Sequence, residues 1–252
     1  MFRFFKIRRK AYLQTIRLHK KNDTLMIAHR GLSGIRRENT LPSFELAGKH
    51  SYYGIETDVH VTSDGKFVII HDDDTSRVSN KSYKVEKTDF DTLRSIKLNN
   101  LRTGKPDDEL KIPTLEEYIL VCKKYDKVSF LELKNPFKRE HIEQIVKIID
   151  GLDYLDKVVF ISFDLNNLIV LRELLPEQKI MYLTDEFNEK IFNILKKYNL
   201  GIDAQYPVMT EEIVKKLHSE KIPVNVWTCN KHSDGKKLIS AGVDYITTNI
   251  LE

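Results

Sequence analysis

Short runs of apolar and β-branched residues alternate with longer amphipathic segments from residue 24 almost to the end of the chain. A short apolar run bounded by polar residues is typical of a strand that is buried on both faces of a parallel sheet. We expect strands over residues 24–29, 53–61, 66–71, 127–133, 157–162, 179–184, 200–205, 223–228 and 243–248.

Apolar positions with helical spacing fill most of the gaps, over residues 41–50, 113–125, 137–152, 164–175, 186–198, 210–220 and 232–242. Thr114 and Glu117 have the spacing of a capping box at the start of one of these helices. Strands that alternate with helices form parallel βαβ units, and about eight such units are the content of a (β/α)₈ TIM barrel. A doubly wound open sheet is the alternative, but no Gly-rich phosphate loop follows the first strand. We therefore predict an α/β fold of the TIM-barrel class.

The link between the second and third predicted strands is too short for a helix and contains a turn signal. If Asp64 and Gly65 form a two-residue turn, Asp58 lies opposite His71 in the hairpin. Glu56 is two residues from Asp58 and projects from the same face. The hairpin therefore predicts a patch of two carboxylates and one histidine.

Charge is divided unevenly along the chain. The net charge is +4, yet residues 1–22 hold eight Lys or Arg and no acid, which leaves 33 basic and 37 acidic residues in the rest. We predict a basic extension over residues 1–23 and a single barrel domain over residues 24–252, with an insertion at 72–113, after the third predicted strand, that covers the substrate. A folded domain without excess positive charge argues against nucleic-acid binding.

The basic extension allows two interpretations. Tyr12, Leu13 and Ile16 have helical spacing, which would suit an amphipathic helix in peripheral contact with an anionic membrane. The other interpretation is a solvated extension that packs loosely on the domain. The chain has no long apolar run for a signal or a membrane span, and its two cysteines fit buried thiols in a reducing compartment, so we expect a cytoplasmic protein.

Charged side chains recur where the predicted parallel strands end. His29 and Arg30 close the first strand, and Glu132 and Lys134 close the fourth. The carboxyl ends of barrel strands meet on one rim. We therefore expect these four residues to lie close to Glu56, Asp58 and His71.

This set of side chains favours a particular chemistry. Three clustered carboxylates repel one another unless a cation joins them, so we expect Glu56, Asp58 and Glu132 to bind a hard divalent cation rather than zinc. Arg30 and Lys134 would hold a phosphate, and the two histidines could transfer protons near neutral pH. The prediction is phosphoryl transfer on a phosphoester. The simpler interpretation is a set of structural histidines and exposed ion pairs.

The motifs that carry these residues resemble those of the glycerophosphodiester phosphodiesterase family in their order along the chain. The similar motifs are His29-Arg30-Gly31, Glu38-Asn39-Thr40, Glu56-x-Asp58-Val59, Thr62-x-Asp64-Gly65, His71-Asp72, Leu131-Glu132-x-Lys134 and the segments 112–119 and 224–230. The resemblance covers about residues 24–250 and implies a (β/α)₈ barrel with an insertion after the His-Asp motif.

The resemblance also implies roles for individual residues. His29 and His71 would be the general acid/base pair, and Arg30 and Lys134 would hold the phosphate. Glu56, Asp58 and Glu132 would bind the divalent metal, Ca²⁺ or Mg²⁺. Trp227 would line the alcohol side of the substrate. The implied reaction is hydrolysis of a small glycerophosphodiester to sn-glycerol 3-phosphate and an alcohol.

Two positions depart from the pattern of that family. Arg37 stands where a proline usually precedes Glu-Asn-Thr, which suggests a less rigid and more cationic loop, and Tyr53 stands where a small residue is common. The cationic loop and tail keep a second class open, a membrane-associated lysophospholipase D-type or phosphatidylinositol-cleaving enzyme. A third class, a non-catalytic phosphodiester-binding module, would lack one of the histidines or carboxylates, and all of them are present here.

Overall fold

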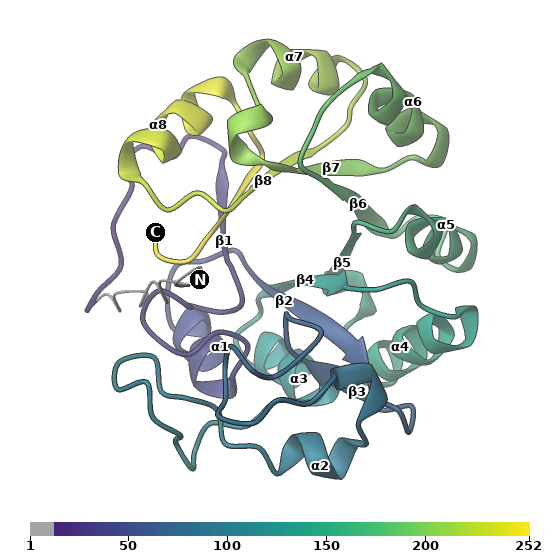
Figure 1. Cartoon of the computed structure of the whole chain (residues 1–252). Coiled ribbons are helices and arrows are strands. Elements are labelled where there is room, and N and C mark those ends of the chain that lie inside the picture. Colours follow the sequence, from purple (N-terminus) through teal and green to yellow (C-terminus); the bar gives the residue numbers. More distant parts are fainter. Residues whose placement is uncertain (1–12) are drawn as a thin grey trace, which may run out of the picture.

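The computed structural model describes residues 13–252, in which nine strands form one sheet (Figure 1). Eight of the strands are parallel and close into a barrel, because the first strand pairs with both the second and the last. The TIM-barrel prediction is confirmed. The strands are β1 Leu25–Ala28, β2 Gly54–Val61, β3 Phe67–Ile69, β4 Val128–Leu133, β5 Val158–Ser162, β6 Lys179–Thr184, β7 Gly201–Gln205, β8 Val224–Trp227 and β9 Tyr245–Thr248.

Helices ring the barrel on its outer side in Figure 1. Each of the seven predicted helices is found, and the capping box of Thr114 and Glu117 is formed. A further short helix, α2, lies in the inserted segment. The helices are α1 Leu41–Gly48, α2 Phe90–Arg94, α3 Leu115–Lys124, α4 Arg139–Gly151, α5 Leu165–Leu174, α6 Glu189–Tyr198, α7 Glu211–Ser219 and α8 His232–Ala241.

Alternate residues of each barrel strand face the interior and the helices. On β4, Val128 and Phe130 join the apolar cluster inside the barrel, whereas Leu131 and Leu133 join the larger core beneath the helices. The next interior position of β4 after Phe130 is Glu132. Near the carboxyl ends of the strands the interior therefore changes from apolar to charged.

The hairpin of β2 and β3 has a different register from the predicted one. A hydrogen bond from the N–H of Thr62 closes a three-residue loop, and Gly65 ends this loop with a φ of 77°. This is a common three-residue hairpin loop. The predicted two-residue turn is wrong, because Ile70 rather than His71 pairs with Asp58 through its backbone. His71 lies one residue farther on, past the end of β3.

The segment between β3 and α3 contains the predicted insertion, residues 72–113. It is less irregular than its polar composition indicates, since it holds α2 and a 3₁₀ turn, Val85–Lys87. Its apolar residues pack with the end of the hairpin in a small core of their own, which contains Val68, Ile70, Val78, Val85, Leu93, Ile96, Leu98, Leu110 and Ile112. The inserted segment is thus a packed unit on the rim of the barrel.

The described part of the N-terminal extension lies against the carboxyl terminus. Ile16 forms a backbone bridge with Leu251, and Leu18 is buried in the main core. Residues 13–23 contain no helix, and the rest of the predicted amphipathic helix falls on residues 1–12, outside the described part. Among residues 13–252, no helix has the length and apolar character to cross a membrane.

Candidate active site

The chain leaves β1 through an unusual backbone conformation that aims its end into the barrel. Arg30 and Gly31 both have positive φ, 55° and 72°. A side chain at Gly31 would lie 2.5 Å from the Ser43 hydroxyl, so this position requires glycine. The turn brings the N–H of Arg30 to Glu56, where it donates to Oε2 at 2.8 Å. In the His-Arg-Gly sequence, the glycine is therefore required by the backbone conformation. The arginine places its backbone N–H against the carboxylate of Glu56.

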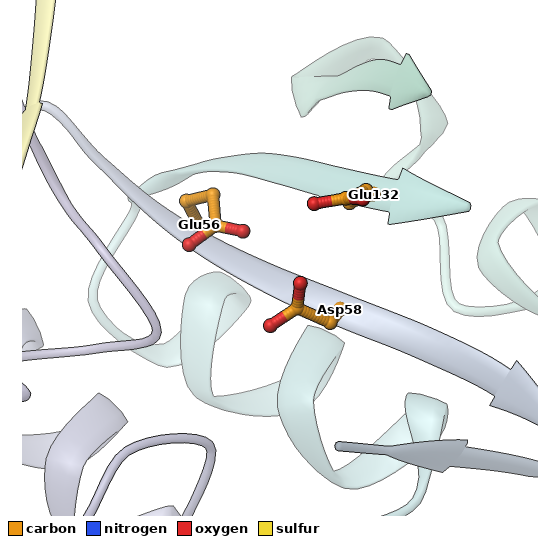
Figure 2. A group of neighbouring side chains, drawn as sticks. All are labelled: Glu56, Asp58 and Glu132. Atoms are coloured by element: carbon orange, nitrogen blue, oxygen red, sulfur yellow. The ribbon is translucent and has the colours of Figure 1, made fainter. Parts of the chain in front are cut away.

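Three carboxylates converge beside this turn, as Figure 2 shows. Glu56 and Asp58 project from β2, and Glu132 projects from β4, where it is the register partner of Asp58. All three are buried, and one oxygen from each lies within 4.8 Å of the others. The structure thus brings together the three acids that we selected from the sequence as metal ligands.

The acids do not ionise equally. Burial and then the charge of Asp58 raise the pKa of Glu132 to about 7, and the same two causes raise the pKa of Glu56 well above its usual range. Burial also opposes ionisation of Asp58, but the charges of Arg30, Lys134 and His71 outweigh it and hold its pKa below the usual range. Such opposed shifts are typical of carboxylates that share one buried site, because their negative charges disfavour simultaneous ionisation.

The donor set fits a divalent cation. Oδ1 of Asp58 and Oε1 of Glu132 are buried, and neither accepts a hydrogen bond of normal geometry from the residues that the structure describes. Nζ of Lys134 lies 2.8 Å from that oxygen of Glu132 and 3.6 Å from that of Asp58. Buried anionic oxygens with spare lone pairs are the ligands that Ca²⁺ and Mg²⁺ prefer.

Two cations border the carboxylates. Nε of Arg30 lies 3.5 Å from Oδ2 of Asp58, and its Nη1 donates to Glu38 at 2.8 Å. The side chains of Arg30 and Lys134 are only 12% and 14% exposed, so their charges act in a site with little screening. They form the predicted pair of cations that could hold a phosphate.

The two histidines have different partners. Nδ1 of His29 lies 2.7 Å from the amide oxygen of Asn249, which can only accept, so Nδ1 carries the proton and Nε2 keeps its lone pair. Burial and then the charge of Arg30 lower the pKa of His29 to about 3, and its Nε2 lies 3.9 Å from Glu56. His29 is therefore a neutral imidazole with an accepting nitrogen at the carboxylates.

His71 contacts a carboxylate instead. Its Nδ1 lies 2.6 Å from Oδ1 of Asp72, and its side chain is 31% exposed. Burial opposes ionisation of Asp72, but hydrogen bonds from His71 and Arg77 keep the pKa of Asp72 below its usual range. The Nδ1 partner of His71 is therefore an ionised carboxylate, whereas that of His29 is a neutral amide oxygen.

Trp227 ends β8 and packs, partly buried, against the apolar cluster inside the barrel. Its indole N–H donates to the backbone oxygen of Asp203 at 3.1 Å, and Phe163 packs edge-on against its ring at 5.7 Å. Phe163 is 44% exposed. The two aromatic rings thus pack together where β5 and β8 end.

Several partners of the site residues escaped the sequence analysis. Asn249 orients His29, and Asn39 donates to Oδ2 of Asp58 at 2.7 Å. Asn249 directly follows the last strand, so the rule that selected His29 could have found it. Asn39 stood in the Glu-Asn-Thr motif without an assigned role. Arg77 had no signal, because it lies in the inserted segment.

The loop before the Glu-Asn-Thr motif is anchored rather than loose. Nε of Arg37 donates to the backbone oxygen of Asn99 at 2.5 Å, and the hydroxyl of Thr40 donates to the backbone oxygen of Arg37 at 2.7 Å. Arg36, its neighbour, is exposed. Arg37 thus ties this loop to the inserted segment.

Asp203 is a buried acid inside the barrel that the sequence analysis also missed. It is 2% exposed, and its Oδ1 accepts no hydrogen bond from residues 13–252. Burial, despite a hydrogen bond from Asn225, raises the pKa of Asp203 from 3.8 to about 8. Between these two pH values the folded chain holds a proton that the unfolded chain has lost, so the free energy of unfolding falls as pH rises, by up to about 1.4 kcal/mol per unit.

We expect Asp203→Asn to stabilise the fold at pH 8 and to change its stability little at pH 4, because asparagine has the same shape and does not titrate. Denaturant unfolding of the wild type and the variant at both pH values measures this difference. The same difference in unfolding free energy at both pH values would show that Asp203 titrates normally.

Comparisons with known proteins agree with this geometry. A sequence model of the glycerophosphoryl diester phosphodiesterase family matches residues 29–252. A glycerophosphodiester phosphodiesterase of Bacillus altitudinis is 30% identical over 237 residues, which are 90% of this chain and 94% of that protein.

Solved structures give the same result. The Oleispira antarctica phosphodiesterase, in complex with the product sn-glycerol-3-phosphate, has a TM-score of 0.82 and 28% identity, over 89% of this chain and 92% of that one. A glycerophosphodiester phosphodiesterase from Thermotoga maritima has a TM-score of 0.72 and 28% identity, over 90% and 94% of the two chains.

Proposed function

The chain belongs to the glycerophosphoryl diester phosphodiesterase family, and from this premise we propose that it hydrolyses small glycerophosphodiesters to sn-glycerol 3-phosphate and an alcohol. The observation that carries the proposal is the convergence of three buried carboxylates, two cations and two differently partnered histidines at one end of the barrel. The likeness to a phosphodiesterase that binds sn-glycerol-3-phosphate supports this substrate class.

We assign each histidine a role in proton transfer on the basis of its hydrogen-bond partner. His29 is neutral and its Nε2 faces the carboxylates, so it accepts the proton of the attacking hydroxyl group. His71 is paired with an anionic Asp72, so it gives a proton to the oxygen of the leaving alcohol as the bond from phosphorus to that oxygen breaks. The net reaction consumes one water and releases the monoester and the alcohol.

The remaining residues bind and orient. Arg30 and Lys134 hold the non-bridging oxygens of the phosphate. Their positive charges stabilise the negative charge that develops on these oxygens in the transition state. Glu56, Asp58 and Glu132 would hold a divalent cation, Ca²⁺ or Mg²⁺. When bound, such a cation polarises the phosphoryl group. Trp227 lines the alcohol side of the substrate.

Glycerophosphocholine is the substrate that tests this function. We expect equal amounts of sn-glycerol 3-phosphate and choline, measured by enzyme-coupled assays with Ca²⁺ and with Mg²⁺. Vesicles of lysophosphatidylcholine and of phosphatidylinositol, at equal molar concentration, should release products much more slowly.

Faster release from either lipid would overturn the proposal in favour of the membrane-associated class. Binding of glycerophosphocholine without any product would favour the non-catalytic module. A phosphomonoester, sn-glycerol 3-phosphate itself, is the control and should release no inorganic phosphate.

A further inference from the structure

One arginine of the inserted segment connects the two halves of the site. A row of side chains with alternating charge runs across the rim, and every neighbour in the row is within ion-pair or hydrogen-bond distance. In order, the row consists of Asp58, Arg30, Glu38, Arg77, Asp72 and His71. Arg77 comes from the inserted segment, as Asp72 does, and has not been given a role above.

Arg77 binds both of its neighbours with more than one nitrogen. Its Nη1 and Nη2 donate to the two oxygens of Glu38 at 2.8 and 2.7 Å. Its Nε and Nη2 donate to the two oxygens of Asp72 at 2.5 and 3.1 Å. A planar guanidinium that binds two carboxylates in this way fixes their relative position and orientation, which a lysine ammonium cannot do.

Both carboxylates depend on this arrangement because both are charged. The side chain of Glu38 is only 6% exposed. Burial opposes its ionisation, but the hydrogen bond from Arg77 and the charge of Arg30 keep its pKa below the usual range. Without Arg77, the buried carboxylate of Glu38 would lose two donors, and the hydrogen bond from Arg30 to it has a single nitrogen as donor.

Two members of the row, Arg30 on one side of Arg77 and His71 on the other, need exact placement for phosphoryl transfer. Arg30 shares Oε1 of Glu38 with Arg77, so any movement of Glu38 moves the guanidinium of Arg30. His71 shares Oδ1 of Asp72 with Arg77, so any rotation of Asp72 turns the imidazole. An error of about 1 Å in such a position can lower a rate by about 100-fold.

We propose that Arg77 is a positioning residue, which fixes the proton-donating His71 relative to the phosphate-binding Arg30 through Asp72 and Glu38. This inference deepens the proposed function and rests on it for the roles of His71 and Arg30. A merely structural role, in which Arg77 only attaches the inserted segment to the barrel, makes different predictions.

The test compares two substrates that share the glycerophosphoryl group. Choline leaves as a strongly basic alkoxide and needs a proton from His71, whereas p-nitrophenolate leaves without one. For Arg77→Met, we expect kcat with glycerophosphocholine to fall about 100-fold and kcat with glycerophospho-p-nitrophenol to fall less than about 5-fold. KM should rise for both substrates, because Arg30 is displaced in either case.

Arg77→Lys is the second variant and keeps the charge without the two-sided contact. It should restore KM more than kcat. The double variant Arg77→Met with His71→Ala should have a kcat on glycerophosphocholine within about 5-fold of that of His71→Ala alone, because both changes remove the same proton donor. Additive losses, or equal losses with the two leaving groups, would overturn the proposal.

The matched control is Arg94→Gln. Arg94 also lies in the inserted segment, is partly exposed, and bonds to the carboxylate of Glu117 and the backbone oxygen of Ile112. Neither of these two partners belongs to the row. It should leave the ratio of the two rates unchanged. If Arg94→Gln changes that ratio as much as Arg77→Met does, then attachment of the segment explains the effect and the proposal is wrong.

A proton NMR measurement separates this proposal from the proposed function, since it needs no turnover. The short bond from Nδ1 of His71 to Asp72 should give a downfield imidazole resonance, assigned by its loss in His71→Ala. It should persist in Arg94→Gln and broaden or vanish in Arg77→Met. An unchanged resonance in a folded Arg77→Met variant would overturn the positioning role even if the enzyme acts on another diester.

Discussion

His29→Ala is expected to lower kcat about 10³- to 10⁴-fold with every leaving group, because the variant has no base for the attacking hydroxyl. His71→Ala should lose as much with glycerophosphocholine but stay within about 10-fold of the wild type with glycerophospho-p-nitrophenol, since that leaving group needs no proton. The asymmetry follows from their partners, a neutral amide at His29 and a carboxylate at His71. Steady-state rates for both substrates measure it.

The control is His19→Ala, which removes an exposed histidine outside the barrel. Its kcat should equal that of the wild type. The thermal midpoints of the three variants should confirm that each is folded. If the good leaving group rescues His29→Ala instead of His71→Ala, the two roles are reversed, and near-normal rates in both variants would remove the histidines from the mechanism.

The order of strands and helices could be predicted because a parallel barrel is covered on its outer side by helices and filled on its inner side by side chains. Its strands are therefore short apolar runs, and its helices show a single apolar face. Each predicted strand is found within about two residues of its expected ends. The register of the β2–β3 hairpin could not be predicted in the same way. Whether the β2–β3 loop has two or three residues depends on the backbone at Gly65, and both versions fit the same turn signal.

The site was predictable where topology alone brings residues together. Parallel strands of a barrel end on one rim, so acids and histidines at strand ends, such as Glu132 and His29, had to meet. His71 lies near Asp58 although the predicted register was wrong. It follows the end of β3, where side chains no longer alternate between the two faces of the sheet. The position of Arg77 could not be predicted, because it lies in a loop of the inserted segment. Such a loop has no strand or helix periodicity from which the direction of a side chain can be inferred.

Removal of divalent cations with a chelator is expected to lower kcat by 10³-fold or more, with recovery on adding Ca²⁺ or Mg²⁺. The reason is the buried group of Glu56, Asp58 and Glu132, which repel one another and keep two oxygens without a normal hydrogen bond from any described residue. A cation that binds only the folded state also stabilises it by mass action. The thermal midpoint should therefore rise with added metal, in a way that does not depend on any assay of turnover.

Asp58→Asn keeps the size of the side chain and removes one charged ligand. It should lose both the activity and the rise in thermal midpoint. Asp203→Asn is the matched control, since it also replaces a buried carboxyl group inside the barrel by an amide but lies outside the group of three. Its midpoint should still rise with metal. Full activity and an unchanged midpoint after exhaustive chelation would mean that Lys134 and Arg30 alone neutralise the carboxylates, so the charge balance of the site would be complete without a metal.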